Sequence, residues 1–162
     1  MESQNRILVF LAEFDFQIEQ LRSIYRILEK KVSLIQKQPV AQESVESAGY
    51  WLHNLYSAFE DLFKQVAGFW ENSLSSDGEF HTRLLKRMML DIKDVRPALL
   101  SETGFRILNE LRGFRHVFRH AYSYGLDDER VGTLLRKIFE QEDPVFNDLQ
   151  IFRKTVAGFV EE

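Results

Sequence analysis

The chain has 162 residues, of which 44% are hydrophobic, enough for one domain with a buried core. It contains no cysteine, which excludes disulfides and thiolate metal sites and favours a reducing compartment, the cytoplasm. Its net charge of −4 argues against indiscriminate electrostatic binding to nucleic acid, which needs a broad basic surface.

The first predicted helix carries a continuous apolar stripe. Its members alternate steps of four and three residues, the pattern of a helix that packs along its whole length: Ile7, Leu11, Phe14, Ile18, Leu21, Tyr25, Leu28, Val32 and Ile35. Pro39 should end this helix, because proline lacks an amide hydrogen and restricts the residue before it. We expect a long helix of an antiparallel bundle within one chain; a helix that also contributes to a dimer seam is the alternative.

A second helix is predicted from about Glu43 to Glu71, and it is rich in aromatic residues. Its apolar positions follow helical steps on one continuous face, so they are expected to fill a core rather than form a stacking platform: Tyr50, Trp51, Leu55, Phe59, Leu62, Phe63, Val66, Phe69 and Trp70. The stretch NSLSSDGEF, residues 72–80, has the composition of a loop.

Two further helices follow this loop. The third is expected over residues 80–95 and is broken at Pro97. Ser101 is a suitable N-cap for the fourth, which should reach Ala121 or Tyr122.

The last part of the chain predicts two more helices. Gly125 suits a helix end, and Asp127 or Asp128 can cap a fifth helix. Asp143 before Pro144 has the arrangement of an N-cap followed by the first helical residue, which predicts a sixth helix. The fold class is therefore all-α, an antiparallel bundle of about five to six helices in a single domain over residues 1–162.

Several classes of protein are not supported by the sequence. No segment approaches the roughly 20 uncharged apolar residues of a membrane span, and the apolar run within residues 1–17 contains acids, unlike a secretory signal. Phosphate-binding and dinucleotide-binding glycine loops, the His-Glu-x-x-His zinc motif and calcium loops are absent. We expect a soluble protein that does not bind a membrane.

A basic stretch stands out against the acidic chain. Residues 103–124 hold four arginines, Arg106, Arg112, Arg115 and Arg119, against Glu110 alone. A focused basic patch on an acidic body suits a localised anionic substrate.

On a helical wheel this stretch divides into two faces. A buried stripe is expected for Ile107, Leu111, Phe114, Phe118 and Ala121. The opposite arc carries the groups able to hold an anion or move a proton: Arg112, Arg115, His116, Arg119, His120 and Tyr122. This arc is either the solvated cationic end of a helix, favoured by the helix dipole, or a functional site.

His116 and His120 also raise the question of a metal. They stand four residues apart on one helical face, a spacing used for metal pairs, but the local sequence offers no clear third ligand. We therefore predict no metal site and no cofactor.

The segment from Arg115 to Tyr122 reads Arg-x4-His-x-Tyr near the end of a helix. It resembles the motif of the HEPN superfamily, specifically the HepT-like toxins. The segments HNLYSAFEDLFKQVA, FHTRLLKRM and RPALLSETGFRILNELRGFRHVFRHAY resemble other parts of these proteins, so the resemblance covers about residues 48–131.

The resemblance implies a metal-independent endoribonuclease, the toxin of a toxin–antitoxin pair, working as a homodimer whose motif helices line a shared cleft. Arg115 and His120 would be its catalytic residues. Tyr122 would be AMPylated by a nucleotidyltransferase antitoxin of the MNT type, although neighbouring Tyr124 is an alternative target. His116 stands where many HEPN proteins have asparagine, which leaves open whether it is a second acid or base.

The residues suit this chemistry. Cleavage of RNA without a metal needs a base for the ribose 2′-OH, an acid for the leaving 5′ oxygen, and cations for the phosphate, and it yields a 2′,3′-cyclic phosphate. His120 can transfer the proton and Arg115 can hold the phosphate, with Arg112, His116 and Arg119 binding substrate. DNA lacks the 2′-OH and is excluded as a substrate. One histidine cannot be both acid and base, so His116 or the second subunit should complete the site.

Two alternatives to this enzyme remain open. The first is a non-catalytic HEPN subunit that binds substrate for, or regulates, a nucleotidyltransferase. The second is a structural bundle whose basic face binds an acidic protein. No base-reading pocket is legible, so the identity of the RNA, tRNA included, is not predicted.

Overall fold

The computed structural model describes residues 2–71, 78–121 and 125–161. These residues form six helices: α1 (Glu2–Gln36), α2 (Gln42–Trp70), α3 (Phe80–Arg87), α4 (Glu102–Arg119), α5 (Asp128–Glu140) and α6 (Glu142–Glu161). The prediction of an all-α bundle is confirmed. In the described part of the chain, no helix is long and apolar enough to cross a membrane.

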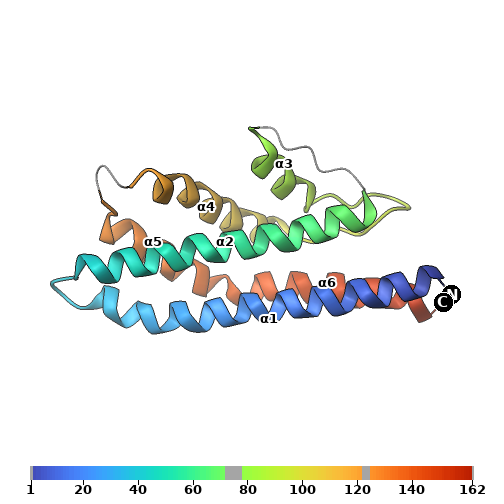
Figure 1. Ribbon diagram of the computed structural model, residues 1–162, viewed down its shortest axis with the longest axis horizontal. Coiled ribbons are helices and arrows are strands. Elements are labelled where there is room, and N and C mark those ends of the chain that lie inside the picture. The colour runs from blue at the N-terminus through green and yellow to red at the C-terminus, as the bar shows by residue number, and fades with distance from the viewer. Residues whose placement is uncertain (1, 72–77, 122–124, 162) are drawn as a thin grey trace.

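The long helices α1 and α2 run side by side in opposite directions, and α6 returns along α1 to bring the two ends of the chain together (Figure 1). Helix α5 covers the other end of α1, and α4 packs on the side of α2 away from α1. The short α3 projects from that same side of α2 and also contacts α4. Helices α2, α3 and α4 therefore meet on one side of the bundle.

The apolar stripe predicted for the first helix forms the core side of α1. Seven of its positions are buried and the other two, Ile7 and Val32, are half-buried; the buried ones are Leu11, Phe14, Ile18, Leu21, Tyr25, Leu28 and Ile35. Aromatic rings fill one end of this core, where Phe14 contacts Phe152 of α6 at 5.5 Å between ring centroids. Of the aromatic residues predicted to fill the core from α2, Phe59 and Phe63 are buried, and Trp51, Phe69 and Trp70 are half-buried against the core, whereas Tyr50 is exposed.

The third helix is shorter than predicted. It ends at Arg87, and the following segment turns back, with Asp94 at a positive φ of 62° and an isolated bridge between Ile92 and Arg96. The physical reason is the buried guanidinium of Arg96, which donates hydrogen bonds to the carbonyl oxygens of Arg87, Leu90 and Pro97. The spacing of apolar residues within residues 80–95 gives no sign that the Arg96 side chain binds these carbonyl oxygens.

A buried ion cluster secures the same segment. The Arg96 side chain has no exposed surface, and its Nε donates to Glu71 Oε1 at 2.8 Å. Arg87 pairs with the other oxygen of the Glu71 carboxylate. Because Glu71 directly follows α2 and Arg87 ends α3, this cluster fixes the short helix to the long one.

The start of α4 is capped as predicted. Ser101 Oγ accepts a hydrogen bond from the Gly104 amide at 3.2 Å, and Asp148 of α6 accepts from both the Ser101 amide and its hydroxyl. The predicted end was too long, since α4 stops at Arg119 and His120 is its non-helical C-cap.

The last two helices begin differently. Asp127 caps α5, as predicted, by accepting from the Glu129 amide at 3.0 Å. The prediction for α6 was wrong by two residues: the helix begins at Glu142, so Asp143 and Pro144 lie within its first turn. The reason is the short link from α5, which leaves only Gln141 between the two helices.

Candidate active site

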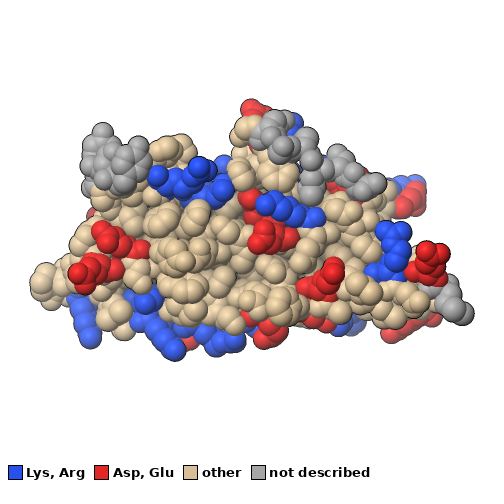
Figure 2. Space-filling model, viewed as in Figure 1, with Lys and Arg blue, Asp and Glu red and all other residues tan. Residues whose placement is uncertain are grey.

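The basic face, formed by Arg112, Arg115, His116, Arg119 and His120, lies on the last turns of α4. Figure 2 shows Lys and Arg side chains gathered over this helix on the side of the bundle where α3 projects. Arg112 and Arg115 are half-buried, whereas His116, Arg119 and His120 are exposed. The opposite side packs inward through Ile107, Leu111 and Phe114, which are buried, and through Phe118 and Ala121, which are half-buried. The predicted division of the helix into two faces is confirmed for its described residues; Tyr122, also predicted on the polar face, lies outside them.

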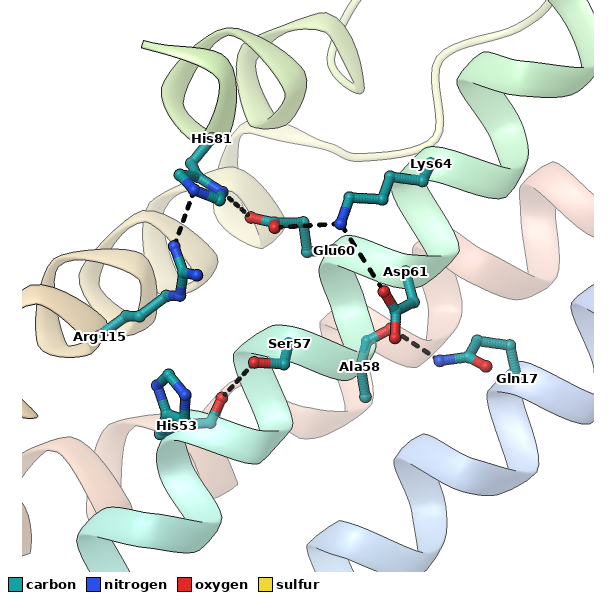
Figure 3. A network of polar contacts seen from close by, with 9 residues as sticks. All are labelled: Gln17, His53, Ser57, Ala58, Glu60, Asp61, Lys64, His81 and Arg115. Carbon is teal, nitrogen blue, oxygen red and sulfur yellow. Dashed lines mark hydrogen bonds and ion pairs between the residues drawn. The ribbon is translucent and has the colours of Figure 1, made fainter. Parts of the chain in front are cut away.

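Arg115 is part of a polar chain across three helices (Figure 3). Its Nη1 lies 2.9 Å from Nε2 of His81, in the first turn of α3. The other ring nitrogen of His81, Nδ1, lies 2.7 Å from Glu60 Oε2 on α2. Lys64 Nζ, one turn further along α2, lies 3.6 Å from Glu60 Oε1.

The direction of these hydrogen bonds follows from the donors available. A guanidinium can only donate, so His81 Nε2 must accept from Arg115. A neutral His81 then carries its proton on Nδ1, which donates to the Glu60 carboxylate. The side chain of Glu60 is only 6% exposed, and a buried polar group of this kind is stabilised by hydrogen-bonded partners. This series of hydrogen bonds orients both His81 and Arg115.

Sequence reasoning did not place His81 or Glu60 in the site. His81 is 34 positions from Arg115, and Glu60 is 21 positions from His81, so no local spacing joins them. The spacing of Glu60 and Lys64 does place them on one face of α2. Only the packing of α3 and α4 against α2 shows that this face meets Arg115.

The two motif histidines form a separate pair. The rings of His116 and His120 lie 4.5 Å apart between centroids, and both residues are exposed. Arg115 contacts His81, and no contact between Arg115 and His120 is found in the described part of the chain. No group of three or more residues suited to hold a metal ion occurs there either.

The other predicted site residues are placed as follows. Arg112 donates from Nε and Nη2 to Asn109 Oδ1, at 3.1 and 3.0 Å, within its own helix. Arg119 is exposed at the end of α4. The predicted modification site Tyr122, and its alternative Tyr124, lie outside the described residues.

Next to the polar contacts of Arg115, His81 and Glu60, His53 of α2 packs under the basic face. Its ring stacks on Phe118, 5.1 Å between centroids, and its Nδ1 is buried with no hydrogen-bond partner in the described structure. Burial, followed by the nearby charges of Arg115 and Arg119, lowers the pKa of His53. The imidazole is therefore held neutral.

Tyr56, also on α2, is fully buried. Its hydroxyl has no hydrogen-bond partner among the described residues. Burial and then the Glu60 charge raise the pKa of Tyr56 well above its usual range, and Arg112 and Arg115 act in the opposite direction. Its phenol thus stays protonated and neutral.

The lowered pKa of His53 predicts a pH-dependent stability. In the unfolded chain His53 binds a proton near pH 6.5, whereas the folded chain disfavours protonated His53. The free energy of unfolding is therefore not reduced by His53 above about pH 6.5, and it falls at lower pH. In His53→Phe, which preserves an aromatic ring against Phe118, this dependence should be absent. Urea unfolding at about pH 7 and about pH 5 should show the smaller loss for the variant; equal losses would contradict the prediction.

A family model described as HepT-like protein matches residues 47–156, more than half of the chain. The chain belongs to the HepT-like family. Comparisons with curated proteins and with solved structures gave no match. The matched span of this HepT-like chain includes all of α3 and α4, together with Glu60 on α2. The resemblance seen in the motif from Arg115 is thereby confirmed at the level of the family.

Proposed function

We propose that this HepT-like chain is a metal-independent endoribonuclease toxin. Membership of the family supports a HEPN-type ribonuclease toxin in general. The observation that carries the proposal is the partner of Arg115, which is the imidazole of His81 and not a carboxylate. A guanidinium that donates to an imidazole, with no carboxylate to offset its positive charge, can attract an incoming phosphate and grip it through its remaining N–H donors.

The other residues of the face then take distinct roles. His120 transfers a proton during cleavage, and Arg119 and Arg112 strengthen the positive field around the scissile phosphate. His116, whose ring adjoins that of His120, binds substrate beside it. The 2′-oxygen attacks the phosphorus, which yields a 2′,3′-cyclic phosphate and a 5′-hydroxyl.

The test is cleavage of RNA in the presence of a chelator. Purified protein incubated with total RNA or tRNA and EDTA should produce fragments with 2′,3′-cyclic phosphate and 5′-hydroxyl ends. A DNA strand of the same sequence should stay intact, because it lacks the 2′-OH. Intact RNA, or cleavage that EDTA abolishes, would contradict the proposal. The non-catalytic alternative predicts intact RNA together with binding to a nucleotidyltransferase.

The proposed partner is an MNT-type nucleotidyltransferase antitoxin that AMPylates Tyr122. AMP on this residue, seven positions after Arg115, would add a bulky anion near the basic face and compete with the substrate phosphate. Tyr122→Phe should keep RNase activity and escape silencing by the partner with ATP, whereas the control Tyr124→Phe should still be silenced. Mass spectrometry locates the modification, and AMP on Tyr124 would contradict the assignment.

We also propose that the active form is a homodimer in the cytoplasm. The exposed pair of His116 and His120 is distinct from the contact between Arg115 and His81. A second copy packed against this face would bring the two motif helices together.

A further inference from the structure

We infer that His81 is the catalytic base of the RNase reaction, the group that removes the proton from the ribose 2′-OH. This inference rests on the proposed function and deepens it. It answers the requirement for a second proton-transfer group, which His120 cannot meet by itself. The group comes from α3, outside the motif of α4.

The hydrogen bonds of His81 give it the form of a base. Its Nδ1 faces Glu60 at 2.7 Å, and its Nε2 accepts from Arg115 at 2.9 Å, so the unprotonated nitrogen points to the phosphate-binding group. The side chain is 36% exposed, which leaves the ring accessible to substrate. Figure 3 shows the ring between the two partners, held from both sides.

The position also suits the substrate. A phosphate held by Arg115 brings the ribose bonded to it, and the attacking 2′-oxygen belongs to that ribose. A base next to the guanidinium is therefore within reach of the proton that must leave. As the phosphate engages Arg115, the 2′-OH replaces the guanidinium N–H at Nε2 of His81.

Glu60 supports the charge that forms on the ring. When His81 takes a proton it becomes an imidazolium, and the buried Glu60 carboxylate already accepts from its Nδ1. A buried carboxylate in this relation holds the tautomer and stabilises the cation, as in other carboxylate–histidine pairs. Lys64 interacts with the second oxygen of Glu60, at 3.6 Å, and helps hold it in place.

The reaction balances in protons and bonds. The 2′-OH gives its proton to His81 Nε2, and its oxygen forms a bond to phosphorus. The bond from phosphorus to the 5′ oxygen breaks, and that oxygen takes a proton from protonated His120. His81 ends protonated and His120 neutral, and exchange with water restores both.

A purely positioning role for His81 is the competing explanation, and His81→Gln separates the two. Glutamine keeps a side-chain oxygen able to accept from Arg115 but has no basic nitrogen. We expect kcat to fall about 100-fold to 10,000-fold in this variant, with KM nearly unchanged. Wild-type kcat in His81→Gln would overturn the assignment. His81→Asn, which keeps an N–H toward Glu60, should show the same loss and an unchanged melting temperature.

A substrate with sulfur in place of the 5′ bridging oxygen distinguishes base from acid. A thiolate leaves without help from an acid, so this RNA should restore the rate of His120→Ala but not that of His81→Gln. Restoration of His81→Gln would make His81 the acid and overturn the inference. If the wild-type protein leaves both RNAs intact, the proposed function fails and this inference with it.

A measurement on the wild-type protein is independent of activity. Histidine ¹⁵N chemical shifts should show the His81 tautomer that carries its proton on Nδ1, with Nε2 as the acceptor. A proton on Nε2 would contradict the inference even if RNA is cleaved.

Discussion

RNA cleavage should fall about 100-fold to 10,000-fold when His120 is replaced with alanine, because a positioned proton donor contributes this much to the rate. Arg115→Ala should cause a loss of at least about 100-fold, since it removes the cation next to the scissile phosphate. The two variants should differ in which kinetic parameter changes. His120→Ala should lower kcat alone. Arg115→Ala should also raise KM, because in the proposed mechanism Arg115 holds the phosphate both before and during the reaction.

Initial rates on a defined RNA in EDTA measure both effects. The matched control is Arg106→Ala, which removes an arginine from the same helix. The Arg106 side chain is 74% exposed and pairs with Glu102 near the start of α4, about two and a half helical turns before Arg115. It should keep wild-type activity. An equal loss in Arg106→Ala would mean that overall charge, and not the site, determines the rate.

Arg115→Lys is a sharper test of the same residue. Lysine keeps the charge but not the planar set of five N–H donors, which contacts His81 in the free protein and can bind a phosphate through two parallel hydrogen bonds. We expect only partial recovery of activity. Full recovery would show that charge alone suffices and would contradict the arrangement proposed for Arg115.

Arg96→Met should lower the free energy of unfolding by about 3–5 kcal/mol, the cost of breaking a buried ion pair by removing one partner. The Arg96 side chain has no exposed surface, and its loss leaves Glu71 without one of its two cations. It also leaves the carbonyl oxygens of Arg87, Leu90 and Pro97 without this donor. Methionine keeps an unbranched apolar side chain but lacks the guanidinium, so the effect combines the lost ion pair and hydrogen bonds with some lost buried volume.

Urea unfolding followed by circular dichroism measures this change. The matched control is Arg106→Met, whose exposed ion pair with Glu102 should contribute less than about 0.5 kcal/mol. Because Arg96 and Glu71 hold the end of α3, Arg96→Met should also reduce RNA cleavage through His81. A loss of stability below about 1 kcal/mol would contradict the structural role of the cluster.

Local patterns in the amino-acid sequence were sufficient to predict six helices, although not the end of α3 or the start of α6. The stripe from Ile7 to Ile35 and the caps Ser101 and Asp127 depend on residues within a few positions of one another. Such local relations repeat at the period of the helix, which makes them legible in the order of amino acids. The motif from Arg115 is local in the same way, and together with the segments around it, it indicated the family.

The contacts that the motif makes with other helices are visible only in the folded structure. Arg115 meets His81 of α3, and His81 meets Glu60 of α2, because three helices pack on one side of the bundle. The end of α3 was set likewise by a guanidinium 25 positions away from its carboxylate partner Glu71. These contacts join residues with no fixed spacing, so their geometry exists only once the hydrophobic faces have packed and brought the helices together.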